Sequence, residues 1–170
     1  MQKIAKFEKV SFNQFKKDFL DCFENYNEKE ILSIYENILL PIRATIGSSG
    51  YDFYSPINIT LIPYETIKIP TGIRCNINDG WFLAIFPRSG LGFKFRLQLN
   101  NTVGIIDADY YNALNEGHIM CKLTNDTNEN KVVEVKALQG FVQGIFLPFG
   151  VTIDDETNEI RVSGFGSTTK

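Results

Sequence analysis

Residues 87–110, with the sequence PRSGLGFKFRLQLNNTVGIIDADY, carry three kinds of group that could act on a nucleotide. The Arg-Ser-Gly sequence at 88–90 offers a guanidinium, a hydroxyl and backbone amides, all of which can bind phosphate oxygens. Asn101 lies in a predicted turn that could present backbone donors and acceptors to a planar ligand. Asp107 follows an apolar run and is a candidate general base. Together these groups predict a nucleotide hydrolase.

Each of these groups also has an ordinary structural explanation. An isolated Arg-Ser-Gly sequence is usually a turn, and an aspartate after two isoleucines often caps a strand or lies on the surface. These explanations do not account for all three groups within one short segment. Their co-occurrence therefore favours the functional interpretation.

The spacing of apolar residues predicts the elements that position these groups. Residues 93–99 alternate apolar and polar side chains as FKFRLQL, which predicts a half-buried strand with its two phenylalanines and two leucines on one face. The pair Asn100 and Asn101 tolerates left-handed backbone, and residues 103–106 form a second apolar run. We therefore expect a β-hairpin over this segment.

Most of the chain after Pro41 shows the same two-residue period, punctuated by Gly, Pro and Asn. Strands are predicted at residues 43–45, 58–62, 65–69, 72–76, 81–86, 93–99, 118–124, 131–135 and 141–149. Many short strands at close spacing indicate an all-β jelly roll or antiparallel β-barrel.

Residues 1–40 follow a helical period instead. Phenylalanines recur at positions 12, 15, 19 and 23 after Ser11, which can cap a helix. A second apolar stripe within 31–39 ends at Pro41. These residues predict an N-terminal helical extension that packs on the main body or covers a subunit contact.

The composition restricts the compartment and the partners. The 170 residues are enough for one domain, and 44% of them are hydrophobic. A net charge of −3 gives no basic surface for non-specific nucleic-acid binding, although free nucleotides remain possible ligands. The three cysteines show no metal-ligand spacing, and the single histidine cannot build a zinc site. With no signal sequence and no membrane-spanning run, we expect a cytoplasmic protein without membrane or nucleic-acid partners.

Three further segments stand out from the strand pattern. Residues 43–52 form a Gly/Ser-rich turn that leads into Tyr51 and Asp52, and could equally be a flexible connector. Gln143 interrupts an apolar strand, and a buried amide needs partners that a ligand could supply. The tail at 161–170 has the composition of a flexible terminus, but its Arg, Phe and hydroxyls would also suit a lid over a nucleotide.

These segments together resemble the trimeric dUTP pyrophosphatases, or dUTPases. That family is marked by five motifs in fixed order, which stand here as ATIGSSGYD, PRSGL, NNTVGIIDADY, GFVQGIF and RVSGFGST. The resemblance covers about three quarters of the chain and leaves the predicted helices outside. A loop at 111–116 is longer than the common continuation of the third motif.

The resemblance implies a jelly-roll β-barrel that assembles as a homotrimer with active sites shared between subunits. Together with the helical pattern of the N-terminal residues, it predicts three parts: a helical extension at 1–40, the barrel at 41–150, and a flexible arm at 151–170 that closes over the site. It also implies Mg²⁺-dependent hydrolysis of dUTP to dUMP and diphosphate. This reaction limits uracil incorporation into DNA and supplies dUMP for dTMP synthesis.

Residue roles carry over from the motifs. Asp107 corresponds to the general base, and Asp52 would position the water shell of the metal. Tyr110 would pack on the deoxyribose and exclude a ribose 2′-hydroxyl. The implied uracil contacts are Asn101, Gly104, Ile105, Ile106, Met120 and Phe165. The implied phosphate contacts are Arg88, Ser89, Gly90, Gln143, Arg161, Ser167 and Thr168.

Three other functions are considered. A dCTP deaminase shares this fold but needs a catalytic glutamate, for which Glu116 in the inserted loop is the candidate. A catalytically silent nucleotide-binding regulator is a second alternative, although the presence of Asp107 and Arg88 argues against it. A barrel-shaped interaction module is the third, and it would leave the five motifs unexplained.

Overall fold

The fold is built mainly from strands, as the sequence predicts. The computed structural model describes residues 2–159 and residue 161, with 35% of these residues in strands and 19% in helices. Its strands are β1 (Ala5–Lys9), β2 (Ile42–Arg43), β3 (Tyr51–Tyr54), β4 (Ile59–Leu61), β5 (Thr66–Pro70), β6 (Ile73–Ile77), β7 (Trp81–Pro87), β8 (Leu97–Leu99), β9 (Gly104–Ile106), β10 (Met120–Asn125), β11 (Val133–Val135) and β12 (Gly140–Pro148). Its helices are α1 (Phe12–Leu20), α2 (Glu28–Glu36), α3 (Ser89–Phe95) and the short 3₁₀ helix η1 (Ala108–Asn112).

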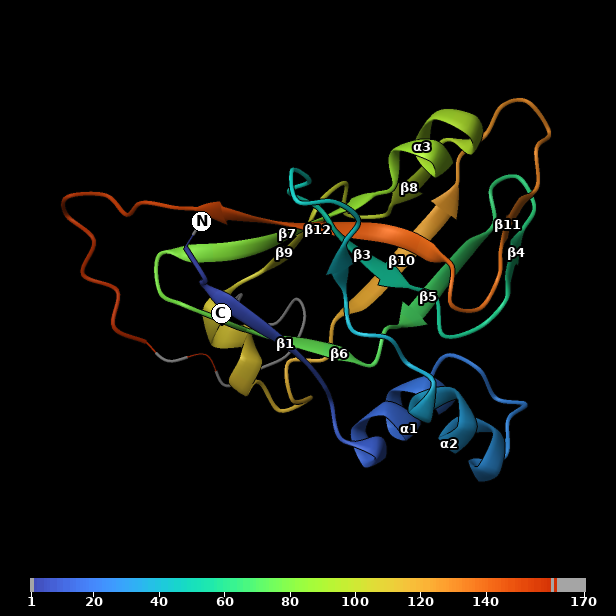
Figure 1. The fold of residues 1–170 in the computed structure, drawn as a ribbon, viewed down its shortest axis with the longest axis horizontal. Helices are drawn as coiled ribbons and strands as arrows, with labels where there is room; N and C mark the ends of the chain where they lie inside the picture. Colours follow the sequence, from blue (N-terminus) through green and yellow to red (C-terminus); the bar gives the residue numbers. More distant parts are fainter. Residues whose placement is uncertain (1, 160, 162–170) are drawn as a thin grey trace.

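The described strands pair antiparallel in four sheets with a jelly-roll-type arrangement (Figure 1). The largest sheet has the order β2-β3-β12-β7-β9, and a second has the order β5-β10-β8. Strand β7 lies between β12, which pairs with one of its edges, and β9, which pairs with the other. Ile85 of β7 is opposite both Gly144 and Gly104. This register places the third and fourth sequence motifs on the two strands that flank β7.

The two predicted N-terminal helices are present, and α1 has the predicted cap. The Ser11 side chain accepts a hydrogen bond from the backbone N–H of Gln14, which satisfies a free donor at the start of α1. Phe15 and Phe19 on the inner face of α1 are fully buried. Burying two aromatic rings holds α1 and α2 beneath one end of the strands (Figure 1).

A strand precedes these helices that the sequence does not predict. Strand β1 pairs with β6 in the register Phe7↔Cys75. The helices α1 and α2 are therefore an insertion between two strands of the body. The alternation over the five residues of β1 is short, its first two residues are exposed and none of the five is fully buried, so the local pattern is weak.

The prediction of a strand over residues 93–99 is wrong for its first half. The chain forms α3 over Ser89–Phe95, and only Leu97–Leu99 is extended. Arg96 takes a left-handed conformation with φ of 52° and ends the helix. Phe93 is 94% exposed, so the apparent apolar face at this end of the segment does not point into the core.

The predicted hairpin is also wrong in its pairing. Strand β8 pairs with β10, whereas β9 pairs with β7 in a different sheet. A tight turn does join them, and Thr102 donates its backbone N–H to the Leu99 carbonyl at 2.9 Å. The left-handed residue is Thr102, with φ of 66°, and not the Asn pair. The turn is local, but the choice of partner strands depends on the whole sheet.

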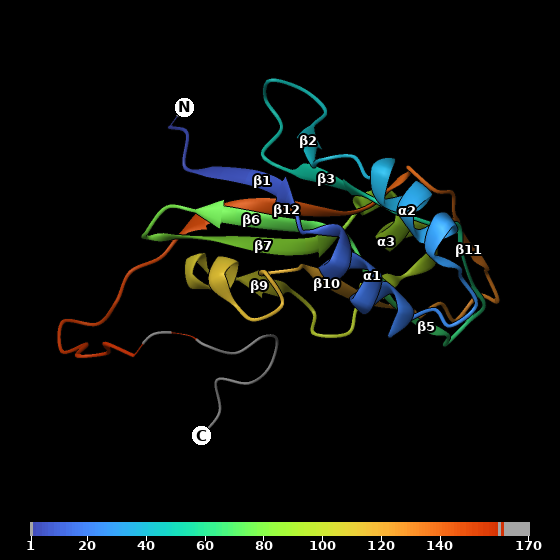
Figure 2. The same cartoon turned by 90° about the horizontal axis from the view of Figure 1, so that it is seen from below.

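Strand β3 was expected to be part of a turn and is instead a central member of the large sheet. After β12 the chain leaves the sheets and turns back toward η1 (Figure 2). Among the described residues, none of the helices combines the length and the apolar character that a membrane span requires.

Candidate functional site

Asp107 lies where β9 ends and η1 begins. Its backbone is extended, with φ of −77° and ψ of 159°, and its carbonyl accepts the Tyr110 N–H at 3.2 Å. The side chain is 52% exposed and makes no capping hydrogen bond to η1. The capping explanation for this aspartate therefore fails. A carboxylate held on a fixed backbone and facing solvent can hydrogen-bond a water molecule.

Arg161 brings the end of the described chain onto this carboxylate. One guanidinium nitrogen, Nη1, lies 3.1 Å from Asp107 Oδ2 and 3.1 Å from Asp109 Oδ1. Burial opposes the positive charge, but the hydrogen bonds to Asp109 and Asp107 raise the pKa of Arg161. The guanidinium also lies 5.1 Å from the centre of the Tyr110 ring. Arg161 therefore offsets part of the negative charge of the two aspartates and lies against the tyrosine ring.

Tyr110 is fixed by its hydroxyl. The side chain is 2% exposed, and its hydroxyl donates to the His118 carbonyl at 2.8 Å. Asn115 Nδ2 donates to the same hydroxyl at 2.7 Å. Burial raises the pKa of Tyr110 to about 12, so the phenol stays neutral. The ring has one defined orientation beside Asp107.

A cavity of about 420 Å³ contains two residues of the predicted uracil contacts, Asn101 and Met120. Its remaining lining residues, which sequence reasoning did not identify, are Asp18, Lys68, Asn100, Asn115 and Lys122. The alternation of β10 places Met120 and Lys122 on one face, so Lys122 could have been found from the sequence. Asp18 could not have been found from the sequence, because it is far from β10 along the chain.

Gly104 begins β9 and packs closely on the neighbouring strand. A Cβ at this position would lie 3.2 Å from Ile85 Cβ and 4.0 Å from Asn101 Nδ2. Ile106 is buried in the core, whereas Ile105 is 48% exposed. The segment from Gly104 to Ile106 is therefore a close-packed edge of the large sheet next to Asn101.

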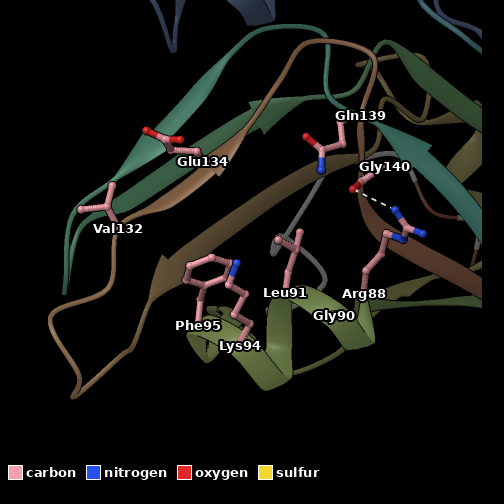
Figure 3. A pocket seen from close by; sticks show the side chains of 9 residues that line it. All are labelled: Arg88, Gly90, Leu91, Lys94, Phe95, Val132, Glu134, Gln139 and Gly140. Carbon is pink, nitrogen blue, oxygen red and sulfur yellow. Dashed lines mark hydrogen bonds between the residues drawn. The ribbon is translucent and has the colours of Figure 1, made fainter.

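Four of the predicted phosphate contacts, Arg88, Ser89, Gly90 and Gln143, form a second cluster around Arg88, whereas Arg161 lies at Asp107. Arg88 Nε lies 3.1 Å from Asp52 Oδ1 on β3, and its Nη1 donates to the Gly140 carbonyl at 3.3 Å (Figure 3). Gln143 Nε2 donates to the Pro87 carbonyl at 3.3 Å. These contacts exist because β3, β12 and the end of β7 meet here. The first, second and fourth motifs are thus brought together.

Glycines provide the space that this cluster needs. A Cβ on Gly140 would lie 2.7 Å from Arg88 Nη1, and a Cβ on Gly50 would lie 2.6 Å from Gln143 Oε1. A cavity of about 520 Å³ opens beside Arg88 and Gly90, between α3 and the loop before β12 (Figure 3). The guanidinium is 41% exposed, so its free edge can reach a ligand.

Asp52 was expected to position the water shell of a metal. Its carboxylate is 20% exposed and pairs with Arg88. Within residues 2–159 and 161, no group of three or more His, Cys, Asp or Glu side chains could hold a metal ion. Mg²⁺ usually keeps several waters and binds through one or two carboxylates plus substrate phosphates. The residues present fit an ion that arrives with a triphosphate, with Asp52 or Asp107 touching its waters.

The expected lid residues Phe165, Ser167 and Thr168 lie outside the described residues. Their roles therefore remain predictions. Ser89 and Gly90 are the first residues of α3, next to Arg88.

The chain has a jelly-roll-type fold, and Asp107 makes no capping hydrogen bond to η1. Mostly polar residues line the cavity beside Asn101, and an ion pair holds the Arg88 guanidinium at the end of β7. Together these features define a class of nucleotide-binding hydrolase. A family model described as dUTPase matches residues 36–169. The deoxyuridine 5′-triphosphate nucleotidohydrolase of Lactococcus lactis is 40% identical over 144 residues, which is 82% of this chain and 95% of the relative. The chain therefore belongs to the dUTPase family.

Solved structures agree with this assignment. The dUTPase of Streptococcus mutans is 32% identical, and the alignment covers 88% of this chain and 98% of that one with a TM-score of 0.63. A Staphylococcus bacteriophage 80alpha dUTPase mutant with bound dUpNHpp aligns over 99% of this chain and 96% of its own length. Its TM-score is 0.64 at 16% identity, which supports the fold alone.

Proposed function

We propose that this protein hydrolyses dUTP to dUMP and diphosphate, which limits uracil incorporation into DNA and supplies dUMP for dTMP synthesis. The observation that carries the proposal is the half-exposed carboxylate of Asp107, which Arg161 connects to the Tyr110 ring. The membership of the chain in the dUTPase family supports it.

The base would bind next to Asn101. The backbone of Gly104, Ile105 and Ile106, together with Met120, would offer donors and acceptors to the uracil edge. Cytosine presents the opposite pattern at its N3 and N4 positions, so it would leave buried polar groups unpaired. Packing against the same segment would exclude the methyl group of thymine. The cavity of about 420 Å³ beside Asn101 is large enough for a base.

The sugar would pack on Tyr110. The Tyr110 hydroxyl donates to the His118 carbonyl and accepts from Asn115, so the ring cannot move away when a ligand binds. A ribose 2′-hydroxyl would then meet a fixed ring, and this explains a preference for deoxynucleotides. Arg161 would move from Asp107 toward the γ-phosphate when substrate binds, with Phe165, Ser167 and Thr168 closing the arm at residues 151–170.

Asp107 would accept a proton from the water that attacks the α-phosphorus. Arg88, with Ser89, Gly90 and Gln143, would bind the phosphates from a neighbouring subunit in a homotrimer. Bound Mg²⁺ would neutralise phosphate charge as the diphosphate leaves. Asp52 fixes the Arg88 guanidinium by an ion pair, so its free edge faces solvent in one orientation.

The deaminase alternative is weakened by the place of Glu116. Its carboxylate accepts hydrogen bonds from the Ser11 backbone N–H at 2.7 Å and from the Ser11 hydroxyl at 2.6 Å. Burial opposes the negative charge, but these hydrogen bonds hold the pKa of Glu116 below its ordinary value. A carboxylate engaged in this way is a poor proton shuttle for deamination.

One assay tests the proposed function. Diphosphate release is measured for dUTP, dCTP, dTTP and UTP with Mg²⁺, and ammonia release is measured for dCTP. We expect rapid diphosphate release from dUTP alone. Ammonia from dCTP would support the deaminase alternative, and nucleotide binding without any product would support the silent regulator.

A further inference from the structure

The loop that carries Tyr110 contacts β1 and the start and body of α1 at three points. Tyr111 donates its hydroxyl to the Glu8 carboxylate of β1 at 2.5 Å, and Glu116 accepts from Ser11, the N-cap of α1. His118 Nδ1 lies 2.5 Å from the Asp18 carboxylate of α1. The Glu116 contact is exposed and the Tyr111 contact is partly buried, whereas His118 is fully buried.

We propose that Asp18 on α1 is a positioning residue for the deoxyribose pocket, acting through His118 on Tyr110. The proposal rests on the proposed function, because it assigns a residue to the sugar specificity of that same site. The match to the dUTPase family model begins at residue 36, after the end of α1.

The hydrogen bonds around His118 determine which ring nitrogen carries the proton. Nε2 accepts the backbone N–H of Gly72 at 2.8 Å, so the proton must be on Nδ1 in the neutral ring. Nδ1–H then donates to Asp18 Oδ2, which also accepts from Gln14 Nε2 at 2.8 Å. Burial opposes the Asp18 charge, but the hydrogen bonds from His118 and Gln14 keep its pKa below the ordinary value. Asp18 is therefore an ionised acceptor for a buried imidazole.

The same histidine holds the tyrosine through its backbone. The His118 carbonyl accepts the Tyr110 hydroxyl at 2.8 Å, so the ring and the carbonyl of one residue connect α1 to the sugar pocket. Beyond Tyr110 lie Arg161 and Asp107. A shift of His118 would move the Tyr110 ring, because the Tyr110 hydroxyl is hydrogen-bonded to the His118 carbonyl.

Asp18 also reaches the base side of the site. Its side chain, which is 15% exposed, lines the cavity that contains Asn101 and Met120. Asn115, which donates to the Tyr110 hydroxyl, lines the same cavity. Asn115 Oδ1 is buried without a hydrogen-bond partner in the part of the chain that the structure describes. One wall of the nucleotide pocket is thus built by the insertion and the loop it contacts.

The test compares Asp18→Ala and Asp18→Asn with Asp21→Asn, a change of an exposed carboxylate just after α1. The values of kcat and KM are measured for dUTP and UTP, and folding is checked by circular dichroism. We expect Asp18→Ala to lower kcat/KM for dUTP about tenfold and to reduce the preference for dUTP over UTP, because the tyrosine is no longer fixed. Asp18→Asn keeps an acceptor for Nδ1–H and should recover part of the preference, while Asp21→Asn should match the unmodified protein.

If the role of Asp18 were purely structural, Asp18→Ala would reduce the fraction of active protein. The ratio of kcat/KM for dUTP to kcat/KM for UTP would then stay unchanged. An unchanged ratio in folded Asp18→Ala would overturn the proposal. If that variant does not fold, Gln14→Ala, which removes only the second donor to Asp18, should lower the ratio about twofold to fivefold, and no change would again overturn it. Failure of the unmodified protein to hydrolyse dUTP would defeat the proposed function instead, so the two failures are distinguishable.

Discussion

The guanidinium of Arg161 lies 3.1 Å from the carboxylate of Asp107, although these residues are 54 positions apart in the sequence. The candidate base is therefore paired with a cation. In the proposed function, binding of a triphosphate would give Arg161 a more highly charged partner and free Asp107 for a water molecule.

Replacing Arg161 by Ala should lower kcat/KM for dUTP about a hundredfold, because a cation for the phosphates and the partner of Asp107 are both lost. Arg161→Lys should keep the positive charge but lose the forked geometry of the guanidinium. Its kcat/KM should therefore lie between those of the unmodified protein and Arg161→Ala. Steady-state kinetics check this order. Equal activity in all three proteins would show that Arg161 has no part in turnover.

Asp107→Asn should leave dUTP binding within a few-fold while lowering kcat by about 10² to 10⁴, because the amide cannot accept a proton from water. Isothermal titration calorimetry measures binding, and diphosphate release measures turnover. Asp109→Asn is the matched control, since it also contacts Arg161 but follows the candidate base by two residues. Normal turnover in Asp107→Asn would remove this residue as the base.

Gly140→Ala should raise KM for dUTP about tenfold, because a Cβ would lie 2.7 Å from Arg88 Nη1 and displace the guanidinium. Gly150→Ala is the control, since nothing lies within 4 Å of a Cβ at that position. The kinetic constants of both variants are compared with those of the unmodified protein. If Gly140→Ala retained the normal KM, the exact placement of Arg88 would not matter for binding.

Ile31→Ala should lower the free energy of unfolding by about 2–5 kcal/mol, because this side chain of α2 is fully buried. Leu32→Ala, the next residue and 40% exposed, should cost less than about 1 kcal/mol. Urea denaturation measures both. Equal effects would indicate that α2 does not pack on the strands as described.

Light scattering after size-exclusion chromatography should give a mass of three times the 19.3 kDa chain. The reason is that the Arg88 cluster is proposed to act on substrate held by a neighbouring subunit. Activity should also fall on dilution below the assembly concentration, and chelation of Mg²⁺ should abolish it. A monomer with full activity would contradict the shared site.

Several features could be predicted from the sequence because each depends on nearby residues. The strands of the body, the two capped helices and the five motifs have local signals in apolar spacing, caps and turns. Asp107 could be selected because it shares one short segment with the Arg-Ser-Gly sequence and the Asn turn. In contrast, the first half of the strand predicted over residues 93–99 was wrong, because a short apolar-polar alternation is also compatible with a short exposed helix.

The amino-acid sequence by itself determined which chemical groups are present and in what order they follow. Only the tertiary structure decided that β8 and β9 join different sheets, that Asp52 meets Arg88, and that Asp18 reaches the nucleotide pocket. Such contacts join residues that are distant in the chain, and their free energy comes from burial and from register over many strands. No local sequence pattern indicates these contributions to the free energy, because they arise only when distant segments pack together.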